Sequence, residues 1–156
     1  NNVPILPYIK VNDNIQIHCH PLYKMKEEWF DWILVKWEYE NSDFQYVPAR
    51  VMQIIDLRGI NGKIADYYKS EIYLCIISLK DSRKKVGKSN VVYKGAYERN
   101  EKHEIRFRMI EISSVHSSCF AIPDCSRLED KDILDCDQWL FVENRKEWAK
   151  HIINIY

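Results

Sequence analysis

Two histidines, His18 and His20, lie two residues apart in a segment where polar and apolar residues alternate. Residues two apart on a β-strand share one face, so both imidazoles could bind one metal ion. A third ligand would have to come from His116 or a later cysteine, and the chain has no Cys-x-x-Cys pair. The pattern therefore favours partly exposed histidines at a strand end. We expect no metal and no cofactor, and a metal-dependent enzyme using His18 and His20 is the third of three hypotheses.

Other catalytic motifs are incomplete. The segment 86–89 (VGKS) ends like a phosphate-binding loop, but Ser82 stands where that loop requires a glycine. Four serines flank His116, yet no nucleophile-elbow motif accompanies them. The acidic segment 129–137 lacks the glycine and glutamate positions of a calcium loop. These patterns predict that the protein is not an enzyme.

Aromatic residues give a clearer indication of function. Residues 29–46 hold seven aromatic side chains: Trp29, Phe30, Trp32, Trp37, Tyr39, Phe44 and Tyr46. Strand alternation places Trp32 and Trp37 on opposite faces, which is more aromatic surface than one small core needs. Two or three rings near an open barrel end, with acidic neighbours, could enclose a methylated ammonium. We therefore predict a ligand-binding aromatic face made of Trp29, Trp32, Trp37 and Tyr39, and core packing is the alternative.

Basic residues gather between positions 80 and 108. This segment has ten Lys or Arg against four Asp or Glu, although the formal net charge of the whole chain is zero. The side chains that could contact phosphates are Arg83, Lys84, Lys85, Lys88, Arg106 and Arg108. Such contacts would be independent of sequence, and the balanced total charge argues against strong autonomous binding. A non-specific nucleic-acid-binding domain with DNA as its partner is therefore the second hypothesis.

The elements that position these side chains are mostly strands. The stretch 29–57 consists of two apolar, aromatic-rich runs around a polar break at 40–43, which predicts a β-hairpin. Pro48 places the second strand of this hairpin near an edge or a bulge. An apolar run over 71–79 predicts a strand that is covered on both faces.

Two later segments show different periodicities. Alternation over 104–112 predicts a strand whose apolar residues, Ile105, Phe107 and Met109, face inward and whose two arginines face outward. At the end of the chain, Asn144 can cap a helix, and apolar residues then recur at helical spacing. A C-terminal helix is therefore expected over 143–155.

Composition limits the class of protein. A chain of 156 residues with 46% hydrophobic and 29% charged residues is typical of one globular domain, here residues 1–156. Five cysteines without regular spacing indicate free thiols in a reducing compartment, nuclear or cytoplasmic. No apolar run approaches the length of a membrane span, so no membrane partner is expected. Because the chain begins at Asn1, we expect a domain excised from a larger protein.

Short motifs resemble a known family. The segments 8–17 (YIKVNDNIQI) and 46–54 (YVPARVMQI) resemble the opening strands of bromo-adjacent homology (BAH) domains, and 112–122 (ISSVHSSCFAI) is similar to a later strand that closes their barrel. The sequence departs from the family at 75–78, where CIIS replaces a Trp-hydrophobic-aromatic-Arg-Pro strand. The Asp-Trp, Val-x-Trp and Pro-Ala-Arg motifs within 31–50 also resemble accessory β-domains of transposon-encoded proteins. Either resemblance implies docking to chromatin, DNA or a protein.

Together these patterns predict a mainly β fold, either a small SH3-like or BAH-like barrel or a strongly bent antiparallel sheet, with a C-terminal α-helix. The first functional hypothesis is a non-catalytic interaction module of a nuclear or mobile-element protein. Its aromatic-rich hairpin would bind a protein or peptide, a histone tail among the candidates.

Overall fold

The computed structural model describes residues 4–23, 27–58, 71–85, 93–123 and 138–142. Lys88 and the helix expected over 143–155 lie outside these residues. The strands are β1 (Ile5–Leu6), β2 (Tyr8–Asn12), β3 (Ile15–Tyr23), β4 (Glu27–Phe30), β5 (Trp32–Glu38), β6 (Phe44–Asp56), β7 (Ile72–Lys85), β8 (Tyr93–Tyr97), β9 (Phe107–Glu111), β10 (Val115–Pro123) and β11 (Gln138–Val142), with a 3-10 helix η1 (Ile112–Ser114) between β9 and β10. The predicted mainly β class is confirmed.

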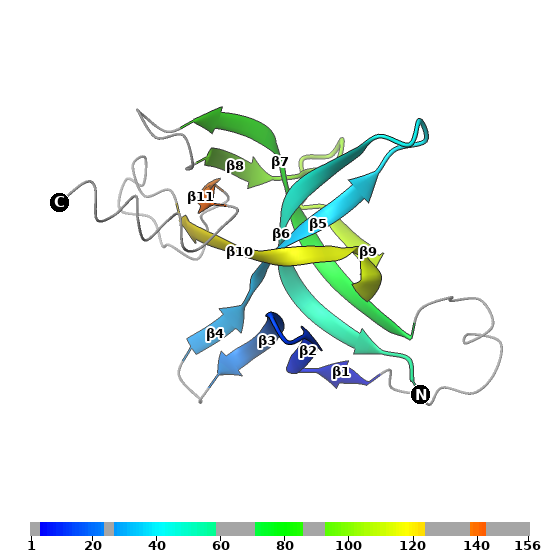
Figure 1. The fold of residues 1–156 in the computed structure, drawn as a ribbon. Coiled ribbons are helices and arrows are strands. Elements are labelled where there is room, and N and C mark those ends of the chain that lie inside the picture. The colour runs from blue at the N-terminus through cyan, green and yellow to red at the C-terminus, as the bar shows by residue number, and fades with distance from the viewer. Residues whose placement is uncertain (1–3, 24–26, 59–70, 86–92, 124–137, 143–156) are drawn as a thin grey trace.

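Six strands close into an antiparallel barrel. Neighbours hydrogen-bond in the order β6, β5, β10, β11, β8, β7, and β7 returns to β6. Figure 1 shows β5, β6 and β10 crossing the middle of the molecule, with the separate sheet of β2, β3 and β4 on one side. Closure pairs most strand edges, which is one way in which β proteins avoid edge-to-edge association. The predicted barrel is confirmed.

One core fills the barrel. Its buried side chains are Trp32, Ile77, Leu79, Tyr97, Trp139 and Phe141, and Met52, Cys119 and Ala121 pack against them. Because all six barrel strands contribute to this cluster, we place it in the barrel lumen. Gly95 of β8 permits a close approach there, since a Cβ atom at this position would lie 3.0 Å from Leu79 Cβ.

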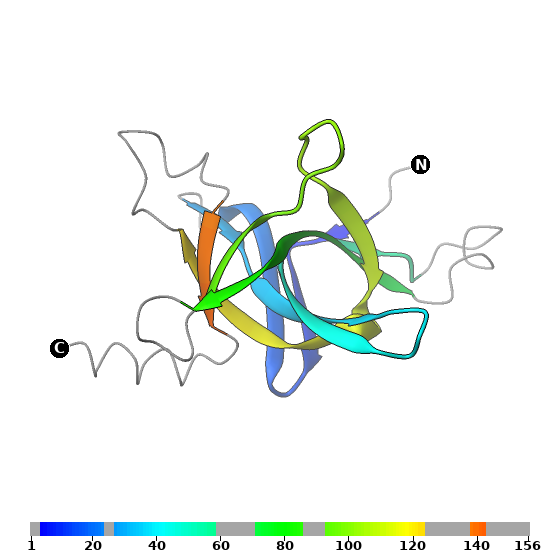
Figure 2. The same cartoon turned by 90° about the horizontal axis from the view of Figure 1, so that it is seen from above.

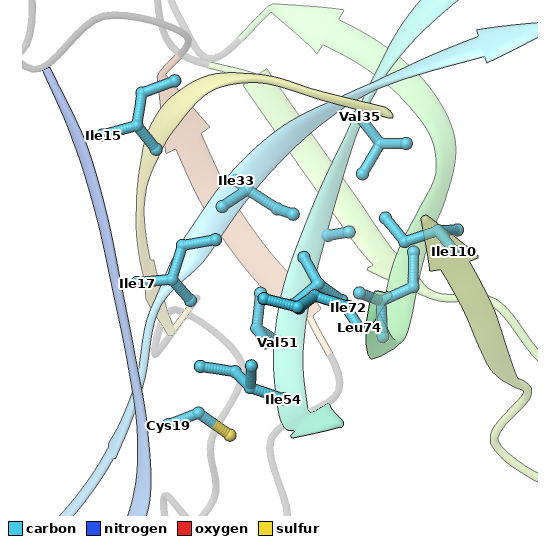
Figure 3. Close-up of a cluster of buried hydrophobic side chains, with 12 residues drawn as sticks. Ile15, Ile17, Cys19, Ile33, Val35, Val51, Ile54, Ile72, Leu74 and Ile110 are labelled. Carbon is cyan, nitrogen blue, oxygen red and sulfur yellow. The ribbon is translucent and has the colours of Figure 1, made fainter. Parts of the chain in front are cut away.

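A second core lies on the opposite face of β5, β6 and β7. Side chains alternate along a strand, so Ile33, Val51 and Leu74 point away from the lumen and pack with residues of β3 and β9 (Figure 3). β5 therefore has a core on each side, and the run Trp32–Val35 is buried throughout. Cys19 also belongs to this core, and burial raises the pKa of its thiol to about 12.

β8 and β9 form one strand that an excursion interrupts. β8 ends at Tyr97 and β9 begins at Phe107, yet both pair with successive parts of β7. At the base of the excursion, Arg106 N donates to Glu98 O at 2.9 Å. Figure 2 shows this excursion projecting from the ring of strands. Residues on its two sides, such as Glu98 and Arg108, therefore become neighbours.

Two turns share one geometry. In the β5–β6 turn, Ser42 N donates to Tyr39 O at 3.1 Å and Tyr39 N donates to Asp43 O at 2.8 Å. The turn 100–104 of the excursion repeats both bonds, at 3.0 and 2.9 Å. Each turn holds one residue with positive φ, 67° at Ser42 and 61° at His103. This left-handed position favours glycine, which neither turn has.

Replacing Ser42 with glycine is expected to raise the free energy of unfolding by about 0.5–1 kcal/mol, because glycine adopts positive φ without the strain of a Cβ atom. Urea denaturation measures the change. Ser42→Ala keeps the Cβ atom and serves as the control, with an expected change within about 0.5 kcal/mol. A loss of stability in the glycine variant would contradict the turn geometry.

Candidate binding site

A cavity of about 270 Å³ opens between the β5–β6 hairpin and the junction of β7, β8 and β9. Its lining includes Trp37, Tyr39, Tyr46, Pro48, Ser78, Lys80, Glu98 and Arg108. Trp37 lies on the same face of β5 as Ile33 and Val35, and it packs at the end of the second core. Since this end is only partly buried, its ring also lines the cavity. We refer to this feature as the hairpin cavity, and it combines aromatic rings with ionisable groups.

Glu98 is the centre of the charged wall. Its carboxylate accepts two hydrogen bonds from Arg108, Nη2 to Oε1 at 2.8 Å and Nε to Oε2 at 3.2 Å. Ser78 Oγ donates to Oε2 at 2.8 Å, and Arg106 Nη1 lies 3.6 Å from Oε1. The hydrogen bonds from Arg108, followed by the bond from Ser78, hold the pKa of Glu98 below its ordinary value. The network fixes Arg108 in one orientation.

Arg108 also covers the aromatic wall. Its guanidinium carbon lies 4.9 Å from the centre of the Trp37 ring, within the range of a cation–π interaction. An internal cation therefore occupies a position on this ring that a ligand ammonium would need. With Arg106 and Lys80 close by, positive side chains outnumber Glu98 on this wall.

Further aromatic side chains lie at the hairpin side of the cavity, which Tyr39 and Tyr46 line. Tyr39 OH donates to Gln45 Oε1 at 2.9 Å. The Phe44 and Tyr46 rings meet edge to face at 5.4 Å, and Tyr46 stacks on His116 at 4.1 Å. Hydrogen bonds and ring contacts therefore hold these side chains in place while they stay accessible.

The four residues predicted to form the aromatic face are separated. Trp37 and Tyr39 line the hairpin cavity. Trp32 is buried in the barrel lumen, where its ring centre lies 4.8 Å from that of Trp139. Trp29 lies on β4 and pairs with His20 of β3, and the structure does not describe the Trp29 side chain.

The six predicted basic residues are also divided. Arg106 and Arg108 flank Glu98 at the hairpin cavity. The backbone of 83–85 forms the end of β7 and pairs with β8, and its side chains are not described. The structure therefore joins part of the basic group to part of the aromatic group in one site.

The predicted orientation of the strand at residues 105–109 is wrong for three of its side chains. Phe107 and Met109 are exposed, whereas Arg108 points toward Trp37 and Ile110 is buried in the second core. The physical reason is that the excursion ends at Arg106, so the strand beyond it follows its pairing with β7 and does not continue the earlier alternation.

His18 contacts the carboxylate of Asp31. Its Nδ1 lies 3.0 Å from Asp31 Oδ2, and its backbone N–H donates to the same oxygen at 2.8 Å. Among the described residues, no group of three or more His, Cys, Asp or Glu side chains could hold a metal ion. The arrangement therefore offers His18 and His20 no third ligand within the described part of the chain.

Sequence reasoning missed Glu98, Ser78 and Lys80. Glu98 and Arg108 are ten residues apart, and only the excursion between β8 and β9 brings them together. The polar segment that begins at Asn100 could have indicated a turn between two strands. Nothing local indicates that the second strand, β9, pairs with the same neighbour, β7, as the first strand, β8.

The fold and site define a closed antiparallel β-barrel with an aromatic and charged cavity beside one hairpin. No family model, curated protein or solved structure matches the chain. None of the helices in the described residues is long and apolar enough to cross a membrane.

Replacing Glu98 with glutamine is expected to cost about 1–2 kcal/mol at pH 7, because the charge-assisted bonds from Arg108 are weakened. The folded-state pKa of Glu98 is lowered, so its contribution is present above the unfolded pKa and is lost as pH falls through the folded pKa. The difference between wild type and variant should therefore narrow below about pH 4.

Urea denaturation at pH 7, 5 and 3 tests this expectation. Glu101→Gln, an exposed position in the same excursion, is the matched control and should show little difference at any pH. A wild-type advantage over Glu98→Gln that stays constant from pH 7 to pH 3 would contradict a stabilising role for the ionised carboxylate.

Proposed function

We propose that this barrel is a non-catalytic interaction module that binds a protein partner at the hairpin cavity. The distribution of exposed apolar side chains carries the proposal. The described residues expose six large hydrophobic side chains, and four of them, Tyr39, Phe44, Phe107 and Met109, lie on β9, on β6 or in the β5–β6 turn, with exposed fractions of 49% to 58%. Tyr39 lines the hairpin cavity, and the other three side chains lie on the two strands β6 and β9, whose residues also line it. Exposed apolar and aromatic side chains on the elements that border a cavity are typical of protein interfaces.

The charge around the site favours a protein over a nucleic acid. The β9 side carries Arg106 and Arg108, whereas the tip of the hairpin carries three acidic residues within 38–43. Those carboxylates would repel a phosphate backbone that crosses the hairpin, whereas a protein surface can present both signs of charge.

The cation over Trp37 further limits the partner. A methylated ammonium could reach this face of the ring only by displacing Arg108, which two hydrogen bonds to Glu98 hold in place. We therefore favour a partner with apolar and neutral or acidic side chains over a methylated histone tail.

Single-stranded nucleic acid is the second candidate. The exposed Tyr39 and Phe44 rings of the hairpin could stack on bases while Arg106, which lies beside Glu98, contacts phosphate. The acidic residues of the hairpin would repel phosphates, so we rank a nucleic-acid ligand behind a protein partner.

We expect Tyr39→Ala to weaken partner binding by at least about tenfold, which corresponds to about 1.4 kcal/mol, because tyrosines in an interface core often dominate the binding energy. The probe is a random linear dodecapeptide library displayed on phage and selected against the full chain. The enriched sequence is then synthesised and titrated by calorimetry. Tyr8→Ala is the matched control, since Tyr8 is also exposed but lies on β2.

Three outcomes would count against the proposal. One is the failure to enrich any peptide, and another is binding that Tyr39→Ala and Tyr8→Ala affect equally. The third is an oligothymidine that binds at 150 mM salt and loses affinity in both Tyr39→Ala and Arg106→Ala, which would establish the nucleic-acid candidate instead.

A further inference from the structure

Among the described strands, β9 has a partner along only one of its two edges. Along one side it pairs with β7 from Phe107 to Glu111, and no strand in the described part of the chain pairs with its other side. A natural edge of this kind is usually protected by lysine, proline, a bulge or a covering segment. β9 has neither lysine nor proline, its Arg108 is bonded to Glu98, and Glu111 is its other charged residue. It exposes two large apolar side chains, Phe107 and Met109.

The end of β5 has a similar edge. β10 pairs with β5 only as far as Val115 opposite Val35. Beyond that pair, residues 36–38 of β5 pair with β6 alone among the strands described. Within the described residues, the end of β5 and the whole of β9 therefore each have one edge without a partner strand.

Both edges border one groove. A cavity of about 480 Å³ is lined by residues 35–38 of β5 and 109–111 of β9, and Ser113 and Ser114 of η1 lie at its end. Figures 1 and 2 both show β9 and the β5–β6 hairpin on the same side of the molecule. The volume is within the range of about 300–1,000 Å³ found for ligand sites. We refer to this cavity as the β5–β9 groove.

We propose that a protein partner inserts an extended segment into the β5–β9 groove and pairs with β9 as an added strand. This inference rests on the proposed function and specifies how the partner binds on the same face. Strand addition to an exposed edge obtains affinity from backbone hydrogen bonds and specificity from alternate side chains.

The side chains around the groove define the chemistry of the segment. Phe107 and Met109 project on the outer face of β9, whereas Arg108 projects on the inner face toward Trp37. An added strand has the same two faces as its neighbour.

Glu38 and Glu111 also line the groove, and alternation places Glu111 on the same outer face as Phe107 and Met109. The outer residues of the segment should therefore be apolar beside Phe107 and Met109 and basic beside Glu111. The residues between them, on the side of Arg108, should be acidic or neutral.

The groove adjoins the hairpin cavity at Trp37. Trp37 lines both cavities, with the charged wall on one side and the edge of β9 on the other. A segment in the groove therefore contacts Trp37, which lines the hairpin cavity together with Tyr39.

Backbone methylation tests the proposal directly. The peptide enriched against the full chain is resynthesised with one N-methyl group at each position in turn. Strand addition is expected to give losses of at least about tenfold at every second residue and small changes between them, because alternate N–H groups face the partner strand. Amide exchange should also slow within β9 when the peptide is bound.

Two variants provide an independent arm. Met109→Lys places a charge on the outer face of β9 and should weaken the peptide by at least about tenfold, because it opposes apolar contacts at that position. Ile5→Lys is the matched control, since Ile5 is equally exposed and lies on the short strand β1, and binding should be unchanged. Thermal unfolding of both variants shows that each remains folded.

The outcomes separate the inference from the proposed function. Binding that needs Tyr39 but shows no alternating methylation pattern overturns strand addition and leaves the interaction module standing. Failure to enrich any peptide overturns both. A dimer in light scattering that Met109→Lys dissociates overturns the inference as well, since the occupant of the edge would then be a second copy of the chain.

Discussion

Replacing Trp139 with alanine is expected to lower the free energy of unfolding by about 4 kcal/mol, the range found for large aromatic residues removed from a packed core. Trp139 is only 7% exposed, and its ring lies 4.8 Å from Trp32 and 5.9 Å from Tyr97. The guanidinium of Arg50 lies 5.2 Å above the same ring and donates to Tyr97 OH at 3.0 Å. The substitution therefore leaves a cavity and also removes the aromatic support of a partly buried cation.

Equilibrium urea denaturation at pH 7 measures this loss. Trp139→Phe keeps most of the packing and should cost less than half as much. Tyr39→Ala is the control for an exposed aromatic residue and should change stability by less than about 0.5 kcal/mol. If Trp139→Ala cost no more than Tyr39→Ala, the assignment of Trp139 to the barrel lumen would be wrong.

The hairpin was predictable because its signals are local. Apolar periodicity and the polar break at 40–43 define β5 and β6, and Pro48 lies one residue before the point where β7 begins to pair with β6. The apolar run 71–79 also indicated a strand covered on both faces, and β7 has one core on each side. The fold class thus depends on features that neighbouring residues determine.

The role of Trp32 was harder to predict. The sequence shows that Trp32 and Trp37 face opposite sides of one strand, and a single small core could not bury both. The structure resolves this with two cores that share β5, so Trp32 packs in the lumen and Trp37 at the end of the second core. Whether a strand has one core or two depends on the path of distant strands, which no local pattern reports.

The candidate site depends on register across the excursion. Glu98 meets Ser78 and Arg108 because β8 and β9 pair with successive parts of β7. A change of one residue in the length of the excursion would reverse the faces of β9. Phe107 and Arg108 would then exchange sides, so even the identity of the exposed residues could not be predicted from alternation.

Replacing Leu74 with alanine is expected to cost about 3 kcal/mol, since large-to-small substitutions in a closely packed core leave a cavity. Leu74 has 0% exposure and lies in the second core between Ile54 of β6 and Ile110 of β9. Urea denaturation measures the loss, and Ile5→Ala on an exposed edge should be nearly neutral. A loss below about 1 kcal/mol would show that the second core is not closely packed.

The same position tests whether the two cores are separate. Leu74 belongs to the second core and Trp139 to the lumen, and the two clusters share no residue. Mutations without shared partners add within about 0.5 kcal/mol, whereas residues of one cluster show larger interaction energies. The milder pair Leu74→Val and Trp139→Phe keeps the double variant folded, and its loss should equal the sum of the single losses. Leu79→Val and Trp139→Phe both lie in the lumen, so the stability loss of this double variant should differ from the sum of its single losses. Additive losses for the lumen pair together with non-additive losses for the Leu74 pair would show that β6 and β7 do not divide the interior into two cores.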